Sequence, residues 1–430
     1  MLAVLFFLSA IAAAAPSPPT YGPAPVFIPL KYKYGGYPRV VTDITYPASN
    51  PIETIVDLGS SDFWVYGPNA IINYGSQYLG VPGPCNLTAK PFYNWPKSKT
   101  HTKPVKNSRG YSYGGNGKLV PSYFDLNDTV SFGNDAVFPP FKNQNVAISN
   151  YTLIKALSDH CKPIDYDHSI LGLSEYVPKS TSSQPKSTGP SFRQDALSRG
   201  EISSPTLSMW FDAPPAKVNG TFQGTALLGA VPKGKYSGEL VHVAPKPPTD
   251  TYVGYYVARP IFKGAPVGKP NAKQTLKLSD TVSQCLIDSG SGQDYLPIDQ
   301  DAFIKLSGLI IHGGYPAYNG TCESIPKDYT IDYTFAGLKG KSVTVKVPLR
   351  NYARGNTDYL GDKKKCGLSM ELDSVASCTF GAPFFTSAFL AFNDEKKQIA
   401  IAQGGVSSGA AQGKNGIGQV TTVQKGQGLP

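Results

Sequence analysis

Two short segments in distant parts of the chain share one pattern, an acid in a turn directly after an apolar pair. The first, TIVDLGSS, covers residues 54–61, and the second, CLIDSGSG, covers residues 285–292. In each segment the aspartate is followed by one residue and then by Gly-Ser. A repeat at this separation predicts two similar lobes related by an approximate two-fold axis. The pattern therefore predicts that Asp57 and Asp288 face each other.

A second pair of matching segments supports the duplication. SILGLS, at residues 169–174, follows the first acid turn, and CTFGAP, at residues 378–383, follows the second. Each is a short strand-like element that ends in glycine, at Gly172 and at Gly381. Two motifs in the same order in both halves indicate a duplicated fold rather than two unrelated turns.

The composition favours a large, mostly β protein. The 430 residues exceed one ordinary core, only 16% are charged, and 44 Gly and 38 Pro punctuate the whole chain. Patches of Val, Ile, Tyr and Thr recur between Gly/Pro turns, while long stretches with helical periodicity are scarce. We expect residues 86–110 to form a long loop, and residues 406–430, rich in Gly, Gln and Ser, to form a flexible tail.

The first 15 residues are expected to be a secretory signal peptide. An apolar run from Leu2 to Ala15 is followed by small residues and prolines. This run is shorter than the roughly 20 residues that a spanning helix needs. The sequence thus predicts a secreted, extracellular protein without a membrane span.

The cysteines and the glycosylation sequons fit an exported chain. An even number of cysteines without a Cys-x-x-Cys motif predicts three disulfides and no metal site. The six cysteines are Cys85, Cys161, Cys285, Cys322, Cys366 and Cys378. The five Asn-x-Ser/Thr sequons, candidates for glycosylation, are at Asn86, Asn127, Asn150, Asn219 and Asn319.

Other functional classes find little support in the sequence. The formal net charge is +10, but the lysines gather in short loops, as at residues 97–106 and 363–365, without a nucleic-acid-binding module. Gly405, Ser407 and Gly409 match a nucleophile-elbow pattern but lie in the expected tail, outside a strand–turn–helix context. The five histidines lack metal-binding spacing. Nucleic-acid binding, serine hydrolysis and zinc chemistry are therefore disfavoured.

Taken in order, these motifs resemble those of the pepsin-like aspartic proteases over nearly the whole mature chain. SSDFWV resembles the family's Ser-Ser-x-x-Trp-Val and contains Trp64, while YSYGGNGKL resembles its flap hairpin and contains Tyr113 and Gly114. The resemblance implies a mostly β, bilobed double β-barrel with approximate two-fold symmetry and a central cleft. It implies an N-terminal lobe over residues 16–232 and a C-terminal lobe over residues 233–405.

The resemblance implies that Asp57 and Asp288 are the catalytic acids of a secreted endopeptidase. Two carboxyl groups held about 3 Å apart share one proton, so one can activate a water while the other protonates the scissile carbonyl. No cofactor or metal is implied, and the expected partner of the monomer is an extended polypeptide in the cleft. Trp64 is expected to support Tyr113 on the flap. The implied dyad-supporting residues are Gly59 and Gly290, which permit close packing, Ser60 and Ser291, which donate to the carboxylates, and Ser289.

The disulfide pairing also follows from the resemblance. It implies a bond between Cys322 and Cys366 inside the second lobe. It makes the segments of Cys285 and Cys378 neighbours, which implies a second bond. Cys85 and Cys161 remain for the third bond.

Two departures from the family favour an alternative function. Leu58 stands where active members carry a hydroxyl that reaches the opposite loop, and its absence predicts a buried donor left unsatisfied at a cost of roughly 1 to 3 kcal/mol. Ser289 keeps its hydroxyl. The first strand-like segment starts at Pro25, which leaves no room for a typical inhibitory prosegment. Xylanase-inhibitor-like proteins of this fold share both features but generally lose the second aspartate. The alternative is therefore a catalytically impaired binding or inhibitor protein, and retention of Asp288 favours the enzyme.

Overall fold

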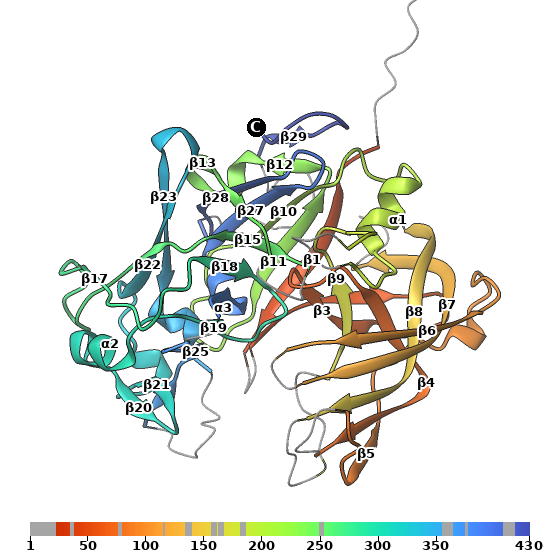
Figure 1. Ribbon diagram of the computed structural model, residues 1–430, viewed down its shortest axis with the longest axis horizontal. Coiled ribbons are helices and arrows are strands. Elements are labelled where there is room, and N and C mark those ends of the chain that lie inside the picture. Colours follow the sequence, from red (N-terminus) through yellow and green to blue (C-terminus); the bar gives the residue numbers. More distant parts are fainter. Residues whose placement is uncertain are drawn as a thin grey trace, which may run out of the picture.

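Strands dominate the computed structural model of the chain. The structure describes residues 23–34, 38–75, 80–114, 117–133, 140–155, 161, 167–180, 186–248, 253–354, 364–374, 377–406 and 418–430. The expected signal peptide at residues 1–15 and the rejected nucleophile Ser407 lie outside these ranges. Figure 1 shows two lobes side by side, with the first half of the chain on the right and the second half on the left. The prediction of a mostly β, bilobed fold is confirmed.

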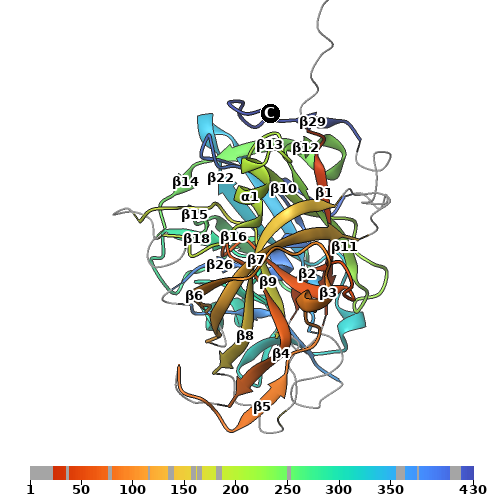
Figure 2. The same ribbon diagram turned by 90° about the vertical axis from the view of Figure 1, so that its right-hand side faces the viewer.

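One sheet of 14 strands runs through the first lobe and into the second. Figure 1 shows its strands passing between the lobes, where β10, β11 and β1 lie beside β27 and β28. Figure 2 shows the first lobe facing the viewer, with β4, β6, β7 and β8 in front. In pairing order the strands are β13 (Ser237–Val243), β28 (Gln398–Gln403), β27 (Ala388–Asn393), β10 (Thr206–Phe211), β11 (Phe222–Leu228), β1 (Val26–Lys33), β2 (Arg39–Thr45), β3 (Ile52–Asp57), β9 (Ser169–Gly172), β4 (Phe63–Tyr74), β8 (Phe141–Ile154), β7 (Leu119–Phe132) and β6 (Val105–Ser112), with β5 (Cys85–Thr88) beside β4.

The second lobe adds smaller sheets. The six-stranded sheet is β14 (Pro245–Lys246), β15 (Tyr255–Ala258), β18 (Gln284–Ile287), β26 (Thr379–Phe380), β19 (Asp294–Tyr295) and β25 (Met370–Glu371). The four-stranded sheet is β17 (Gln274–Thr275), β16 (Ile261–Gly264), β22 (Thr330–Ala336) and β23 (Ser342–Pro348), and the three-stranded sheet is β20 (Ile310–His312), β21 (Tyr315–Tyr318) and β24 (Cys366–Gly367). The α-helices are α1 (Phe192–Ser198), α2 (Gln300–Ser307) and α3 (Ala382–Phe385).

Strand periodicity explains how the halves share a core. In β1, Ile28, Leu30 and Tyr32 alternate along one face and are buried with at most 1% of each side chain exposed. They join one hydrophobic cluster with side chains from the second half, such as Leu390 and Ile401. The two lobes are therefore joined by packing as well as by the shared sheet.

Each acid turn leaves the end of a strand that pairs in parallel with the glycine-ending element of its own half. In the first half β3 pairs with β9, and Asp57 lies opposite Gly172. In the second half β18 pairs with β26, and Ile287, directly before Asp288, lies opposite Phe380. A Cβ at Gly172 would collide with the backbone of residues 61–62, and one at Gly381 would collide with the backbone of Gln293. The same close crossing of turn and strand therefore occurs in both lobes.

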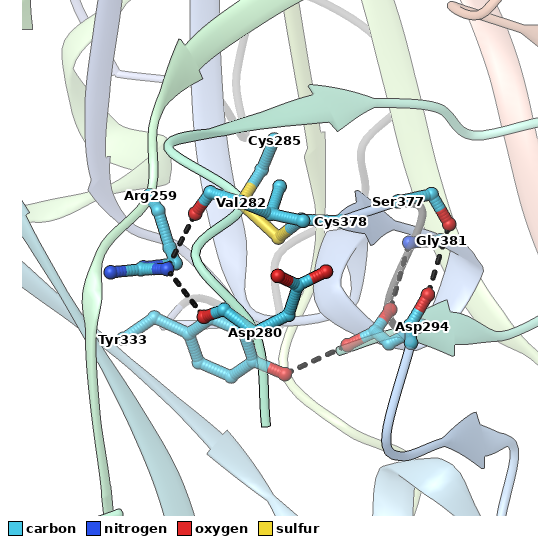
Figure 3. The surroundings of a disulfide bond; sticks show 10 residues. Arg259, Asp280, Val282, Cys285, Asp294, Tyr333, Ser377, Cys378 and Gly381 are labelled. Carbon is cyan, nitrogen blue, oxygen red and sulfur yellow. Dashed lines mark hydrogen bonds between the residues drawn. A yellow bond between two sulfur atoms is a disulfide. The ribbon is translucent and has the colours of Figure 1, made fainter. Parts of the chain in front are cut away.

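The three expected disulfides are confirmed. They join Cys85 to Cys161, Cys285 to Cys378, and Cys322 to Cys366, with Cα–Cα distances of 5.5, 4.5 and 4.9 Å. The Cys285–Cys378 bond links β18 to the segment before β26, next to the second acid turn (Figure 3). Beside it, the Arg259 guanidinium donates to the carbonyl oxygens of Asp280 and Val282 at 3.2 and 2.5 Å.

Two expectations about irregular segments differ from the structure. Residues 86–110 contain most of β5 and the first part of β6, which pair with β4 and β7. The described end of the expected tail, residues 418–430, contains β29 (Val420–Thr422), which pairs with β12 (Ala230–Pro232). Leu429 is only 8% exposed and packs in a cluster with Trp210. The first segment pairs with the strands next to it in the chain, and the second pairs with the distant β12.

The sequons differ in exposure. Asn86, Asn219 and Asn319 are exposed, whereas Asn127 and Asn150 are half-buried. The Asn127 side-chain oxygen also accepts a hydrogen bond from Asn145 at 2.6 Å. Glycosylation at any of these sites stays a prediction.

In the described ranges, no helix combines the length and the apolar composition needed to cross a membrane.

A buried carboxyl group organises the second lobe behind the disulfide. Asp294 is 0% exposed and accepts hydrogen bonds from the Gly381 N–H and the Tyr333 hydroxyl, both at 2.8 Å (Figure 3). It also accepts one from the Tyr352 hydroxyl at 3.0 Å. Burial raises the pKa of Asp294 to about 7. In the unfolded chain the pKa returns to about 4. Between these values the folded state binds more protons, so Asp294 contributes stability that is lost as the pH rises through 7.

We therefore expect Asp294→Asn to change the pH dependence of unfolding. The thermal midpoint of the wild type, measured from pH 4 to 8, should lose the Asp294 contribution as the pH rises, whereas the variant should lack this component. Asp328→Asn, at an exposed position, serves as the control and should follow the wild-type curve. Parallel curves for wild type and Asp294→Asn would contradict the assignment.

Candidate active site

The first acid is held by its own turn. Asp57 is the last residue of β3 and is 5% exposed. Its Oδ1 accepts a hydrogen bond from the Gly59 N–H at 2.7 Å, and its Oδ2 accepts one from the Ser60 hydroxyl at 2.5 Å. These two bonds fix the orientation of the Asp57 carboxyl group. The Ser60 contact agrees with the sequence-based expectation.

The second acid is held by a related but different turn. Asp288 follows β18, and its Oδ1 accepts a hydrogen bond from the Gly290 N–H at 2.9 Å. The Ser291 backbone N–H also bonds to Asp288, but the Ser291 hydroxyl donates to the Gln293 carbonyl oxygen at 3.0 Å. The expectation that the Ser291 hydroxyl donates to the carboxylate is therefore wrong. The two turns match in backbone and differ in this side chain.

Gly59 and Gly290 allow the two acids to meet. A Cβ at Gly59 would lie 2.6 Å from Asp288 Oδ1, and one at Gly290 would lie 2.5 Å from Asp57 Oδ1. Each glycine thus faces the acid of the opposite lobe, and any side chain there would displace it. Burial raises the pKa of Asp288 well above its ordinary value, and the nearby charge and hydrogen bond of Asp57 raise it further. Burial and the neighbouring acid therefore both favour the protonated form of Asp288.

One hydroxyl bridges the two turns. The Ser289 hydroxyl donates to the Val56 carbonyl oxygen at 2.6 Å and accepts from the Leu58 N–H at 3.0 Å. Leu58 occupies the matching position in the first turn but has no hydroxyl, so its side chain cannot form an equivalent hydrogen bond to the second turn. Its side chain is fully buried and joins the main hydrophobic cluster instead. The brace between the acid turns is therefore one-sided.

Trp64 and Tyr113 lie against each other beside the first acid turn. The Trp64 indole N–H donates to the Tyr113 hydroxyl at 2.8 Å, and the ring centroids are 6.5 Å apart. Tyr113 and Gly114 follow β6, and the Tyr113 N–H donates to the Lys118 carbonyl oxygen at 2.9 Å, which closes the hairpin to β7. The Asp57 charge is among the causes that raise the pKa of Tyr113, after burial and Asp62. The contact is the one that the family resemblance implies.

Sequence reasoning missed two charged groups beside this hairpin. Asp62 accepts a hydrogen bond from the Gly189 N–H at 2.7 Å, and burial raises its pKa to about 6. Lys118 is fully buried with its ammonium 5.9 Å from the centre of the Trp64 ring, and burial lowers its pKa to about 8. The available signals were an acid inside SSDFWV and a lysine between the hairpin glycine and a strand. Neither signal specifies a role.

Comparison with known proteins identifies the family. The model of the eukaryotic aspartyl protease family matches residues 47–404, a span that includes both acid turns. The chain belongs to this family. A comparison with curated protein sequences returned no match. Among solved structures, this aspartyl protease resembles the aspartic proteinase from Irpex lacteus, with a TM-score of 0.57, 16% sequence identity and coverage of 91% of this chain and 100% of that chain. At this identity the likeness establishes the pepsin-like fold.

Within the part of the chain that the structure describes, three or more His, Cys, Asp or Glu side chains do not gather as a metal site. The groups that the structure does bring together are the two acids, their backbone donors and the Ser289 bridge. The Trp64–Tyr113 pair lies beside the first of them.

The proximity of the acids predicts a measurable coupling. In Asp57→Asn the pKa of Asp288, followed by carboxyl ¹³C NMR, should fall because a neighbouring negative charge is removed. It should stay above the ordinary value, because burial is the larger cause. Asp301→Asn, exposed in the first turn of α2, is the matched control and should leave the titration unchanged. An unchanged Asp288 pKa in Asp57→Asn would show that the acids are not coupled.

Proposed function

We propose that this protein is an aspartic endopeptidase that hydrolyses extended polypeptides at acidic pH. The observation that supports this most is the dyad itself, in which two buried acids from opposite lobes meet and one holds a raised pKa. Buried like-charged acids split their titration, which is the condition for acid and base chemistry at one site. The family membership supports the same reaction class.

The two acids would divide the chemistry according to their surroundings. Asp57, whose carboxyl group is held by Gly59 and Ser60, would act as the base that takes a proton from an attacking water. Asp288 gives its proton to the scissile carbonyl oxygen as the water oxygen bonds to the carbonyl carbon. Asp57 then passes the proton it took from water to the amide nitrogen, the C–N bond breaks, and Asp288 takes back a proton from a hydroxyl group of the tetrahedral intermediate. Tyr113, held by Trp64, would lie over the bound peptide and reduce water access.

The setting of the reaction is also part of the proposal. Three disulfides fit a protein that folds in an oxidising compartment. We infer a secreted monomer whose signal peptide ends near residue 15. Its lobes would span residues 16–232 and 233–405.

A direct assay tests the activity. A denatured protein substrate should be cleaved at acidic pH, and the rate should fall as the pH rises through the raised pKa of Asp288, because its proton is then lost. Asp57→Asn and Asp288→Asn should each abolish cleavage, and a statine-type transition-state mimic should inhibit the wild type. Asp328→Asn controls for the loss of a carboxyl group at an exposed site. Cleavage that survives either dyad substitution would contradict the mechanism.

Leu58 supports the second candidate, a binding or inhibitor protein on the same scaffold. A one-sided brace leaves the acid turns less constrained, and a misplacement of 1 Å costs about a hundredfold in rate. Oxidised wild-type protein that binds the statine-type mimic but does not cleave any substrate between pH 2 and 6 would favour this candidate.

Leu58→Thr measures the effect of the missing hydroxyl. If the one-sided brace limits catalysis, the variant should raise kcat about tenfold or more, since the threonine hydroxyl would add a second hydrogen bond between the acid turns. Leu58→Val, which is β-branched but lacks the hydroxyl, is the control for the change in shape. An equal rate in wild type and Leu58→Thr would mean that the dyad does not depend on this brace.

A further inference from the structure

A buried arginine lies behind the dyad at the junction of the lobes. Arg193 belongs to α1 in the first half of the chain and is 3% exposed. Its Nη1 donates to the Leu173 carbonyl oxygen at 2.6 Å and to the Tyr255 hydroxyl at 2.7 Å. Its Nη2 forms an ion pair with Asp394 at 2.9 Å. One guanidinium group thus contacts elements of both lobes, in the fork geometry that only arginine provides.

The first contact leads to Asp57. Leu173 directly follows β9, and its N–H donates to the Asp57 carbonyl oxygen at 2.7 Å. The Arg193 guanidinium therefore bonds to the same residue that holds the main chain of the first acid. Because β9 also pairs in parallel with β3, movement of Leu173 would move the end of the strand that carries Asp57.

The second contact leads to Asp288. Tyr255 begins β15, which pairs with β18, and it lies opposite Ile287, the residue before the second acid. The Tyr255 hydroxyl also donates to Asp394 Oδ1 at 2.6 Å, so Arg193, Tyr255 and Asp394 bond to one another. The Tyr255 ring stacks on Phe392 with centroids 4.0 Å apart, which fixes its direction.

The Arg193–Tyr255–Asp394 network connects the two acid turns, where the hydroxyl missing at Leu58 would otherwise add a connection. Because Leu58 has no hydroxyl, the bridge made by the Ser289 hydroxyl has no counterpart from the first acid turn. Arg193 connects the same two turns from behind, through the backbone on one side and through a strand pair on the other. Two further charges face the network, Glu175 and Lys397, which pair with each other. A buried guanidinium that bonds to a carboxylate, a hydroxyl and a carbonyl oxygen holds these groups in one arrangement.

We propose that Arg193 is a positioning residue which, through Leu173 and Tyr255, sets the separation of Asp57 and Asp288. This inference rests on the proposed function for its catalytic consequence. The part of the inference that concerns the distance between the two acids does not depend on catalysis. Loss of the connection would let the two strands drift apart, and the acids would couple less strongly.

The mildest test removes one hydroxyl. Tyr255→Phe keeps the ring on Phe392 but breaks the bonds to Arg193 and Asp394. The matched control is Tyr329→Phe, which removes a buried hydroxyl of the same lobe that donates to the Ala265 carbonyl oxygen at 2.7 Å. Each variant removes one buried tyrosine hydroxyl, which makes two hydrogen bonds at Tyr255 and one at Tyr329. A purely structural effect would therefore lower stability in both variants without a specific change at the acids.

The first measurement is the titration of Asp288 by carboxyl ¹³C NMR on the full chain. Tyr255→Phe should lower the pKa of Asp288 relative to the wild type, because the charge of Asp57 would lie farther away. Tyr329→Phe should leave that pKa unchanged. Equal Asp288 titrations in wild type, Tyr255→Phe and Tyr329→Phe would overturn the proposal and leave Arg193 a structural residue.

The second measurement is peptide cleavage. Tyr255→Phe should lower kcat about tenfold with KM within about twofold, since geometry at the reacting atoms changes and the peptide contacts do not. Tyr329→Phe should retain the wild-type kcat. A Tyr255→Phe enzyme with the wild-type kcat would overturn the catalytic part. If the wild type itself does not cleave peptides, the proposed function fails, and the Asp288 titration still decides whether Arg193 positions the acids.

Discussion

The close approach of two carboxyl groups, one from each lobe, is the constraint around which the other elements of this structure are arranged. Gly59 and Gly290 lack side chains at the points where each turn faces the opposite acid. Gly172 and Gly381 allow β9 and the end of β26 to pack directly against the backbone of the residues that follow each acid turn. Four glycines thus serve one contact, because any Cβ would occupy the space of a neighbouring atom. The raised pKa of Asp288 is the electrostatic result of this packing.

The sequence was most informative where a feature occurs twice. The repeated acid turn and glycine-ending strand predicted two lobes and placed Asp57 and Asp288 together, because a duplicated fold brings equivalent positions to its axis. The family resemblance supplied the three disulfide pairs, which single-sequence reasoning leaves open among 15 connectivities. The repeat is a property of pattern and spacing that a sequence displays directly, whereas the disulfide pairs required the resemblance.

Contacts that depend on tertiary packing were not predictable. The Ser291 hydroxyl donates to the Gln293 carbonyl oxygen, whereas the hydroxyl of its counterpart Ser60 donates to the Asp57 carboxylate. The strands β6 and β29 form because β7 and β12 offer them edges, whereas their own composition indicates loops. Arg193 gives no signal in the sequence, since its partners lie 20, 62 and 201 residues away along the chain.

The pairing of β10 with β27 makes the two halves of the chain depend on each other. Thr206 to Met209 of the first half bond along Leu390 to Asn393 of the second half, in the middle of the shared sheet. A polypeptide that ended after the first lobe would present β10 as an unpaired hydrophobic edge. Such an edge readily pairs with other chains, so β27 of the second half also shields the first half from intermolecular association.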